Sequence, residues 1–242
     1  MAPSLPRPLL FPATLLLLLL LQLSSSASHK HGIRCGVDHK LHAPTPTALG
    51  QSYATPATWS PMRVTINAEL LEGKADPRAC HGVGQVVDPC DGREQTSPAS
   101  CPHNCTAANV VTASKAAFVK ARFGWLRGKV ARLLKVNPVT DEVTFRPSSR
   151  HLVTNRMVEN TDLVIILHMR PHESGHVSGY AGCLQKDQFG RCTVGYVNLC
   201  PEIIDPDTLD LPEGIMSATH TALHETMHIL GAVQLRSIKK GL

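Results

Sequence analysis

Two histidines four residues apart, His224 and His228, carry the clearest chemistry in this chain. On a helix, residues four apart lie on the same face, so both imidazoles can reach one metal ion. Zn²⁺ prefers four tetrahedral ligands, and histidine nitrogen is one of them. Glu225 lies one step round the helix, where a carboxylate can act as general base on a water at the metal. The pattern H-E-x-x-H therefore predicts a zinc-dependent hydrolase. The alternative is an amphipathic core helix with two hydrogen-bonded histidines.

The third protein ligand of such a zinc is not evident. His220 shares the face of His224 and His228, but at ~1.5 Å per residue it is about 12 Å from His228 along the axis, too far for one ion with bonds of ~2.1 Å. We expect His220 to face solvent or to support the site from outside the ligand set. Gly231 permits a sharp turn out of the helix, and no histidine follows it. The remaining candidates lie on another segment that the sequence does not place at the metal: His168, His172 and His176.

Hydrophobic periodicity predicts the elements that would position this helix. The segment 62–70 alternates apolar and polar residues, and 162–169 and 194–199 are short apolar runs, so all three are predicted strands. A helix is predicted over 112–135 and a second, which carries the histidines, over about 215–230. The first has apolar residues at steps of three and four, namely Ala116, Val119, Phe123, Leu126, Val130 and Leu133. This order indicates an α+β or α/β fold with the metal helix packed on a sheet.

Three segments lack periodicity and are predicted loops: 73–105, 171–192 and 201–213. The helix at 112–135 has a polar side with basic residues and no acid. This side could meet acidic partners or anionic lipid, and the alternative is an ordinary solvated surface. Its basic residues are Lys115, Lys120, Arg122, Arg127, Lys129, Arg132 and Lys135.

Composition limits the class of protein. The chain has 242 residues, of which 43% are hydrophobic and 18% charged, as expected of a globular protein with one large or two small domains. The net charge of +5 is modest, and we predict no nucleic-acid partner.

The N-terminal residues 1–28 are typical of a signal peptide, with Arg7, an apolar run over 9–23 and small residues at the end. A signal anchor is the alternative, but Pro12 and Gln22 interrupt a run that is already short for one. No later apolar stretch is long enough to span a membrane. We therefore expect a secreted or cell-surface protein, in which membrane association without a transmembrane segment stays open.

Residues 29–61 are rich in His, Pro, Thr and Ala and are predicted to be a pro-segment. Within them Cys35 lies among basic residues. A thiolate there could bind the zinc and block the site, because a metal lowers the pKa of a thiol. The alternative is that Cys35 is one half of an ordinary disulfide.

Eight cysteines in an exported chain predict disulfides. They are Cys35, Cys80, Cys90, Cys101, Cys105, Cys183, Cys192 and Cys200. Asn104-Cys105-Thr106 is a glycosylation sequon, so Asn104 is a candidate glycan site, unless a bridge at Cys105 prevents it.

Taken together, these segments resemble leishmanolysin and the leishmanolysin-like metallopeptidases. The leader also looks like the family's Arg-Cys-x-x-His motif with one extra residue, since His39 follows Cys35 by four. The resemblance covers most of 60–231, and its carriers are WSPMRV at 59–64, NTDLVI at 160–165, AGC at 181–183, GYVNLCP at 195–201 and the H-E-x-x-H-x-x-G helix at 224–231.

The resemblance implies a secreted zinc endopeptidase of the metzincin type, made as a zymogen, with peptide bonds hydrolysed by metal-activated water. Residues 62–231 would form the N-terminal catalytic subdomain, a twisted mixed sheet packed on two long helices. Protein or peptide substrates would add to an edge strand near 194–199. By position, His224 and His228 bind Zn²⁺, Glu225 is the general base and Cys35 the latency thiolate. Members degrade extracellular or surface proteins, with roles in cell adhesion and migration.

Residues 232–242 depart from the family, which continues through a third histidine ligand and a methionine-containing turn. Cys192 is also extra to the pattern. The alternative expectation is therefore a catalytically inactive, truncated form that lacks the third zinc ligand. A purely structural zinc site is disfavoured, because it needs four closed ligands.

Overall fold

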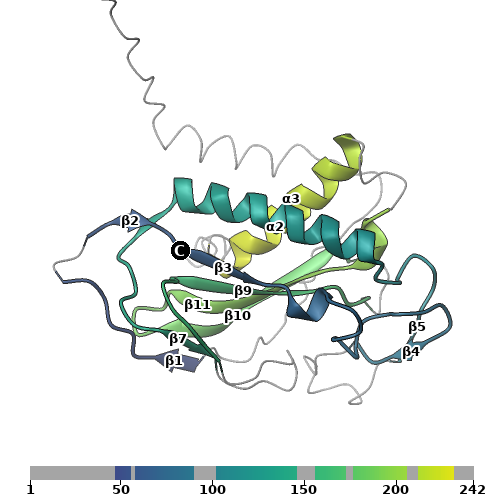
Figure 1. Ribbon diagram of the computed structural model, residues 1–242, viewed down its shortest axis with the longest axis horizontal. Coiled ribbons are helices and arrows are strands. Elements are labelled where there is room, and N and C mark those ends of the chain that lie inside the picture. The colour runs from purple at the N-terminus through teal and green to yellow at the C-terminus, as the bar shows by residue number, and fades with distance from the viewer. Residues whose placement is uncertain are drawn as a thin grey trace, which may run out of the picture. The chain divides into compact units, whose positions relative to one another are not determined.

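A mixed five-stranded sheet forms the centre of the protein, as seen in a computed structural model (Figure 1). The structure describes residues 47–55, 58–89, 102–145, 156–172, 177–205 and 212–231. The strand order is β1-β10-β11-β9-β3. The bounds are β1 Thr47–Leu49, β3 Val64–Asn67, β9 Leu163–His168, β10 Gly179–Asp187 and β11 Cys192–Leu199.

Strands β3, β9 and β11 confirm the three predicted strands and run parallel to one another. Strand β10 is antiparallel to β11, and the short β1 is parallel to the end of β10. The prediction of a loop over 171–192 is wrong, because nine of these residues form β10. Strand β11 therefore lies inside the sheet, and β10 lies between it and the sheet edge.

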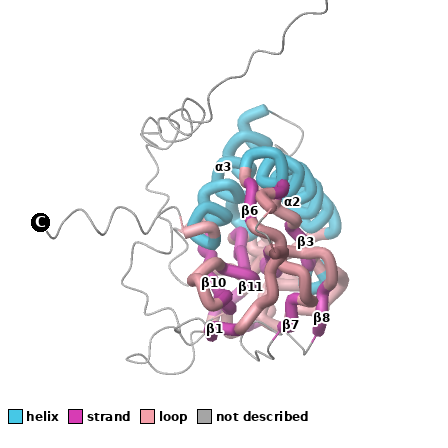
Figure 2. The backbone as a smooth tube through the Cα atoms, turned by 90° about the vertical axis from the view of Figure 1, so that its left-hand side faces the viewer, coloured by secondary structure: helices cyan, strands magenta, loops and turns pink. Residues whose placement is uncertain are grey.

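Two long helices pack on the same face of this sheet (Figure 2). Helix α2, Ala113–Leu133, lies over β3, and helix α3, Pro212–Ile229, lies over β10 and β11. Thr112 begins α2 as its N-cap, since its hydroxyl accepts a hydrogen bond from the Lys115 amide. Both predicted helices are confirmed, although α3 begins at Pro212, within the segment predicted to be a loop. The architecture is α+β, a mixed sheet covered by two helices.

The sheet separates two hydrophobic clusters, because successive side chains of a strand point to opposite faces. Leu163, Ile165 and Leu167 of β9 pack with the helices. Val164 and Ile166 pack on the other side, against Phe145 and its neighbours. Burial on both faces explains why the strand reads as an unbroken apolar run.

Two predictions about α2 need correction. Lys115, predicted on the polar side, is only 2% exposed; its Nζ donates to the carbonyl oxygens of Ala108 and Pro201 at 2.6 and 2.9 Å. Burial lowers the pKa of Lys115, although Glu202 and Asp205 act against that shift. Leu133, predicted in the core, is 50% exposed, because α2 ends there and the chain turns away.

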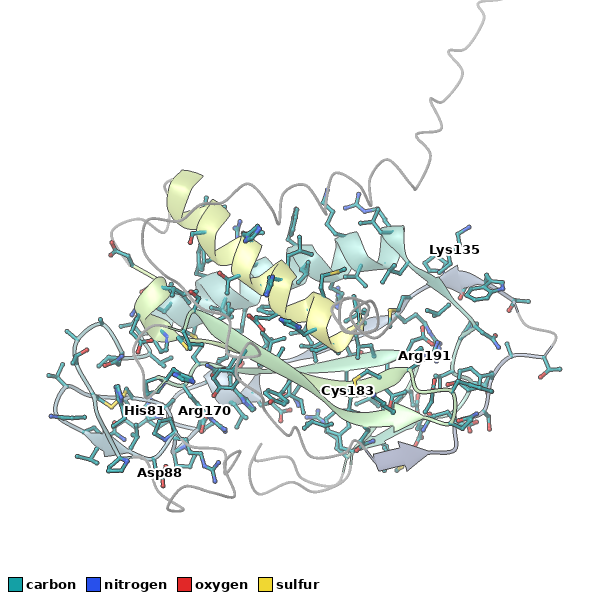
Figure 3. The ribbon with its side chains drawn as sticks, turned by 180° about the vertical axis from the view of Figure 1, so that it is seen from behind. His81, Asp88, Lys135, Arg170, Cys183 and Arg191 are labelled. Atoms are coloured by element: carbon teal, nitrogen blue, oxygen red, sulfur yellow. A yellow bond between two sulfur atoms is a disulfide. The ribbon has the colours of Figure 1, made fainter. Side chains whose placement is uncertain are left out.

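Two ion pairs hold the ends of β9. At its start, the Arg63 guanidinium donates to both carboxylate oxygens of the buried Asp162, at 3.0 and 2.9 Å. After its end, Arg170 donates from Nε to Asp76 at 2.7 Å, and both side chains are buried. Figure 3 shows Arg170 at the end of the sheet near the His81 and Asp88 loop.

The segment 47–55 is attached to the C-terminal end of β10. Strand β1 pairs with 185–187, and Gln51 exchanges two hydrogen bonds with Gln188. The Tyr53 hydroxyl donates to Asp187, and the Arg191 guanidinium lies over the Tyr53 ring. Burial and the Asp187 carboxylate both raise the pKa of Tyr53. Part of the predicted pro-segment, 29–61, is therefore built into the sheet.

The remaining described elements are short pieces at the rim. Strand β2 pairs with β6, β4 with β5 and β7 with β8. Their bounds are β2 Ser60–Pro61, β4 Val86–Val87, β5 His103–Asn104, β6 Lys135–Val136, β7 Val143–Phe145, β8 Arg156–Val158, and the 3-10 turns η1 Glu69–Leu71 and η2 Pro201–Ile203.

Disulfides join Cys80 to Cys105 and Cys183 to Cys192, as expected for an oxidising compartment. Cys192, the cysteine that is extra to the family pattern, thus has its partner across the β10–β11 hairpin. The bridge at Cys105 lies inside the sequon of the exposed Asn104, the arrangement expected to oppose a glycan there. Within the described ranges, no helix is long and apolar enough to cross a membrane.

Candidate metal centre

Helix α3 presents two adjoining rows of side chains to the protein. One row is fully buried against the sheet and contains Ala218, Ala222, Glu225, Thr226 and Ile229. The next row holds His224 and His228, which are half-buried. A carboxylate in the buried row beside two imidazoles in the half-buried row puts three metal-binding groups together.

The two imidazoles point their Nε2 atoms at one another. These atoms are 3.2 Å apart, and the rings are nearly perpendicular. Two nitrogens bound to one tetrahedral zinc at ~2.05 Å would be about 3.3 Å apart, so the observed spacing fits two zinc ligands. The same spacing allows one imidazole to donate a hydrogen bond to the other, which is the alternative expected for a core helix.

Glu225 completes the group. Its carboxylate and the two histidine nitrogens all lie within 4.8 Å of one another. Its side chain is 1% exposed, between α3 and the sheet. Two imidazoles and a carboxylate are a donor set that zinc takes in proteins. In the part of the chain that the structure describes, this is the one cluster of three histidine, cysteine or acidic side chains that could hold a metal ion.

A glycine of β10 makes room for this carboxylate. A Cβ atom added to Gly179 would lie 2.9 Å from the carbonyl oxygen of Asn198 and 3.2 Å from Cγ of Glu225. Gly195 of β11 likewise makes room for a side chain further along α3, since a Cβ at Gly195 would lie 2.8 Å from Cγ2 of Ile229. Helix α3 therefore rests on two glycines of neighbouring strands, and its distance from the sheet depends on both.

Asn198 links the contact between Gly179 and Glu225 to the buried ion pair of Arg170 and Asp76. Its side-chain amide accepts a hydrogen bond from the Arg170 amide at 2.7 Å and donates one to the Arg170 carbonyl at 3.0 Å. The carbonyl oxygen that approaches Gly179 belongs to the same residue. The end of β9, the end of β11 and the start of β10 are thereby held together beneath Glu225.

The described candidates for a third zinc ligand do not lie beside His224 and His228. His168 continues the alternation of β9 on the face away from α3 and stacks on Tyr196, with ring centroids 5.8 Å apart. His172 contacts the edge of Tyr180, a residue of the same far-side cluster. His220 is exposed, which agrees with the expectation that it faces solvent. His176 and Cys35 lie outside the described residues, so their places at the site stay predictions.

The helix ends as its sequence predicts. Gly231 has φ of +79°, a left-handed conformation that favours glycine, and its amide donates to the His228 carbonyl. The chain thus turns out of the helix directly after the second histidine. The tail 232–242 lies outside the described residues.

Sequence reasoning placed His224, Glu225 and His228 together but missed Gly179 and Asn198. A signal for Gly179 was present, because a glycine inside a strand often marks a close approach of another element. It could be used only once 179–187 was assigned to a strand. Comparison of the chain with models of known protein families and with curated proteins finds no match.

Proposed function

We propose that this chain is a zinc-dependent endopeptidase of the leishmanolysin-like metzincin type, exported to an oxidising compartment. The observation that carries the proposal is the 3.2 Å spacing of the Nε2 atoms of His224 and His228, with the buried Glu225 beside them. The resemblance implied a mixed sheet with two long helices, the second bearing these residues, and the α+β architecture supports that assignment.

In this proposal His224 and His228 hold the zinc through their Nε2 atoms. Bound zinc would polarise the scissile carbonyl and lower the pKa of a water molecule at the site. Glu225 would accept a proton from the attacking water and deliver it to the leaving amine. Its burial between α3 and β10 restricts its side chain, so the carboxylate is held beside the histidines in one position.

The substrate class in this proposal is an extended peptide. Residues 179–183 of β10 pair with β11 on one side, and among the described residues β1 covers the other side only at 185–187. A peptide that added as a further strand would therefore join β10, not the 194–199 segment expected from sequence. Helix α3 lies over β10, which would bring the peptide backbone close to Glu225.

The competing proposal is a non-catalytic secreted form. It is supported by the ligand count. If Glu225 acts as the base, the described residues supply two histidine ligands in this cluster, whereas catalytic zinc sites use three protein ligands and an open position. Such a form would keep the fold and bind zinc weakly, without hydrolysis. The two proposals differ in zinc stoichiometry and in their response to changes at Glu225.

The decisive experiment measures zinc per chain and hydrolysis of an unfolded protein such as casein, using purified and dialysed full-length protein. Glu225→Gln should keep near-stoichiometric zinc and lose hydrolysis by at least ~100-fold, the scale of general-base catalysis. His224→Ala should lose both. Cys35→Ala, made alongside, should raise hydrolysis if Cys35 is the latency thiolate.

His220→Ala is the matched control, because it removes an exposed imidazole one turn before His224 on the same helix. It should keep zinc and hydrolysis at the wild-type level. Equal hydrolysis with and without Glu225 would overturn the peptidase proposal. Little retained zinc and no hydrolysis, in the wild type and in Cys35→Ala alike, would favour the non-catalytic form.

A further inference from the structure

The outer face of α2 combines exposed apolar side chains with positively charged ones. The helix contains six basic residues and no acidic one. Trp125 and Leu133 are 47% and 50% exposed, although large apolar side chains are usually buried. Lys129 and Arg132 follow Trp125 by four and seven residues, so they share its face of the helix.

A second segment adds to this face at the C-terminal end of α2. Strand β2 pairs there with β6, with Pro61 opposite Lys135, and Figure 1 shows β2 beside that end of the helix. Trp59, directly before β2, is 70% exposed. Figure 3 shows Lys135 just beyond α2, at the end far from the Asp88 loop. We name this surface the tryptophan patch and define it as Trp59, Trp125, Lys129, Arg132, Leu133 and Lys135.

No carboxylate in the described ranges neutralises the cations of the patch. Nζ of Lys129 lies over the Trp125 ring, 5.2 Å from its centroid, and Nε of Arg132 donates to the Gly128 carbonyl at 3.1 Å. Within the described residues, no acidic side chain forms an ion pair with Lys129, Arg132 or Lys135. By contrast Lys120, on another side of α2, pairs with Glu72 at 3.3 Å. The patch therefore presents positive charge beside exposed rings.

We infer that the tryptophan patch binds the surface of an anionic lipid bilayer. Tryptophan rings prefer the headgroup level of a membrane, where their apolar body and polar N–H are both accommodated. Basic side chains close to a negative leaflet each strengthen binding. A soluble polyanion would be bound by the cations alone and would not favour the exposure of Trp59, Trp125 and Leu133. The exposed apolar side chains therefore favour a lipid surface over a polyanion.

The chain contains two tryptophans, and both belong to the patch. Intrinsic fluorescence of the full-length protein therefore reports on this surface without a label. With vesicles of phosphatidylcholine and about one third phosphatidylserine, we expect co-sedimentation and a blue shift of the tryptophan emission. Vesicles of phosphatidylcholine alone should give much weaker binding.

Charge variants of α2 test the location. Lys129→Gln and Arg132→Gln should each weaken partitioning about fivefold. Lys120→Gln is the matched control, because it removes the same charge from the same helix away from the patch, and it should bind like the wild type. Trp125→Gln should reduce both partitioning and the emission shift, while circular dichroism stays unchanged.

Three results would overturn the inference. One is no co-sedimentation with anionic vesicles. Another is binding without an emission shift and with equal loss in Lys120→Gln, which would indicate diffuse attraction by net charge. The last is equal binding of soluble heparin and vesicles, with neither shifting the emission, which would identify a polyanion surface.

Discussion

Glu225 of α3 packs so closely on Gly179 of β10 that a side chain at position 179 would crowd it. A Cβ atom at Gly179 would lie 3.2 Å from Cγ of Glu225 and 2.9 Å from the Asn198 carbonyl oxygen. The carboxylate with the central role in the proposed chemistry is therefore positioned by a strand that sequence reasoning assigned to a loop.

Gly179→Ala should accordingly disturb the site more than the fold. The methyl group must move α3 or the Asn198 backbone, at a cost of about 1–3 kcal/mol in the free energy of unfolding. We expect zinc retention and hydrolysis to fall as well, measured beside denaturant unfolding. Gly124→Ala on α2 is the control, because nothing lies within 4 Å of an added Cβ there. It should be neutral or stabilise by up to about 1 kcal/mol. If both variants match the wild type, the proposed contact is wrong.

Metal removal should lower thermal stability. A ligand that binds only the folded state stabilises it by about 2.7 kcal/mol when its free concentration is 100 times its dissociation constant. Calorimetry with zinc and with a chelator should therefore give a higher Tm with zinc for the wild type and for Glu225→Gln. His228→Ala should give the same Tm in both conditions. A zinc response that survives in His228→Ala would place the metal at other residues.

The buried pair of Arg170 and Asp76 should contribute strongly to stability. Asp76→Asn removes the carboxylate that faces a guanidinium only 1% exposed, and we expect a loss of about 3–5 kcal/mol in the free energy of unfolding. Glu72→Gln breaks the exposed pair with Lys120 and should cost less than about 1 kcal/mol. Urea titrations compare the two directly. Similar losses in both variants would contradict a special role for the buried pair.

The Arg63–Asp162 pair should make stability depend on pH in the acid range. Burial opposes the charge of Asp162, but hydrogen bonds from Arg63 and from the Val139 amide outweigh it, so the pKa of Asp162 lies below its ordinary value of 3.8. A depressed pKa stabilises the folded state above the ordinary value, and that stability is lost as pH falls toward the folded-state pKa. Asp162→Asn should therefore be less stable than the wild type at pH 7, and the difference should shrink below about pH 4. A difference that stays constant from pH 7 to pH 3 would exclude this account.

The elements predicted correctly are those in which the order of apolar residues along the sequence shows which faces are buried. Strand β9 is apolar from Leu163 to Leu167 because both faces of the sheet are covered there, and the buried residues of α2 recur at helical spacing. The same reasoning failed for β10, which reads GYAGCLQKD. Its glycines are required by the approach of α3 and of the Tyr196 ring, which are contacts between distant segments. Local pattern cannot distinguish such glycines from those of a turn.

Residue type was also a poor guide to whether a polar side chain is buried and which face of the fold it occupies. Lys115 can be buried because its ammonium group donates to the carbonyl oxygens of Ala108 and Pro201, which are far apart in the sequence and meet only in the folded chain. His168 was a candidate third ligand, yet the alternation of β9 places it on the face away from α3. By contrast, the His224–Glu225–His228 group was predictable because a single helix determines its geometry.

The attachment of 47–55 to β10 has a consequence for maturation. If a protease cuts at the boundary expected near residue 61, the peptide bond is lost but the strand pairing, the Gln51–Gln188 bonds and the Tyr53–Asp187 contact are not. Cleavage and departure of the leader would then be separate events with separate rates. A freshly cut molecule would be a two-chain complex, and it would run as one species on a native column and as two on a denaturing gel.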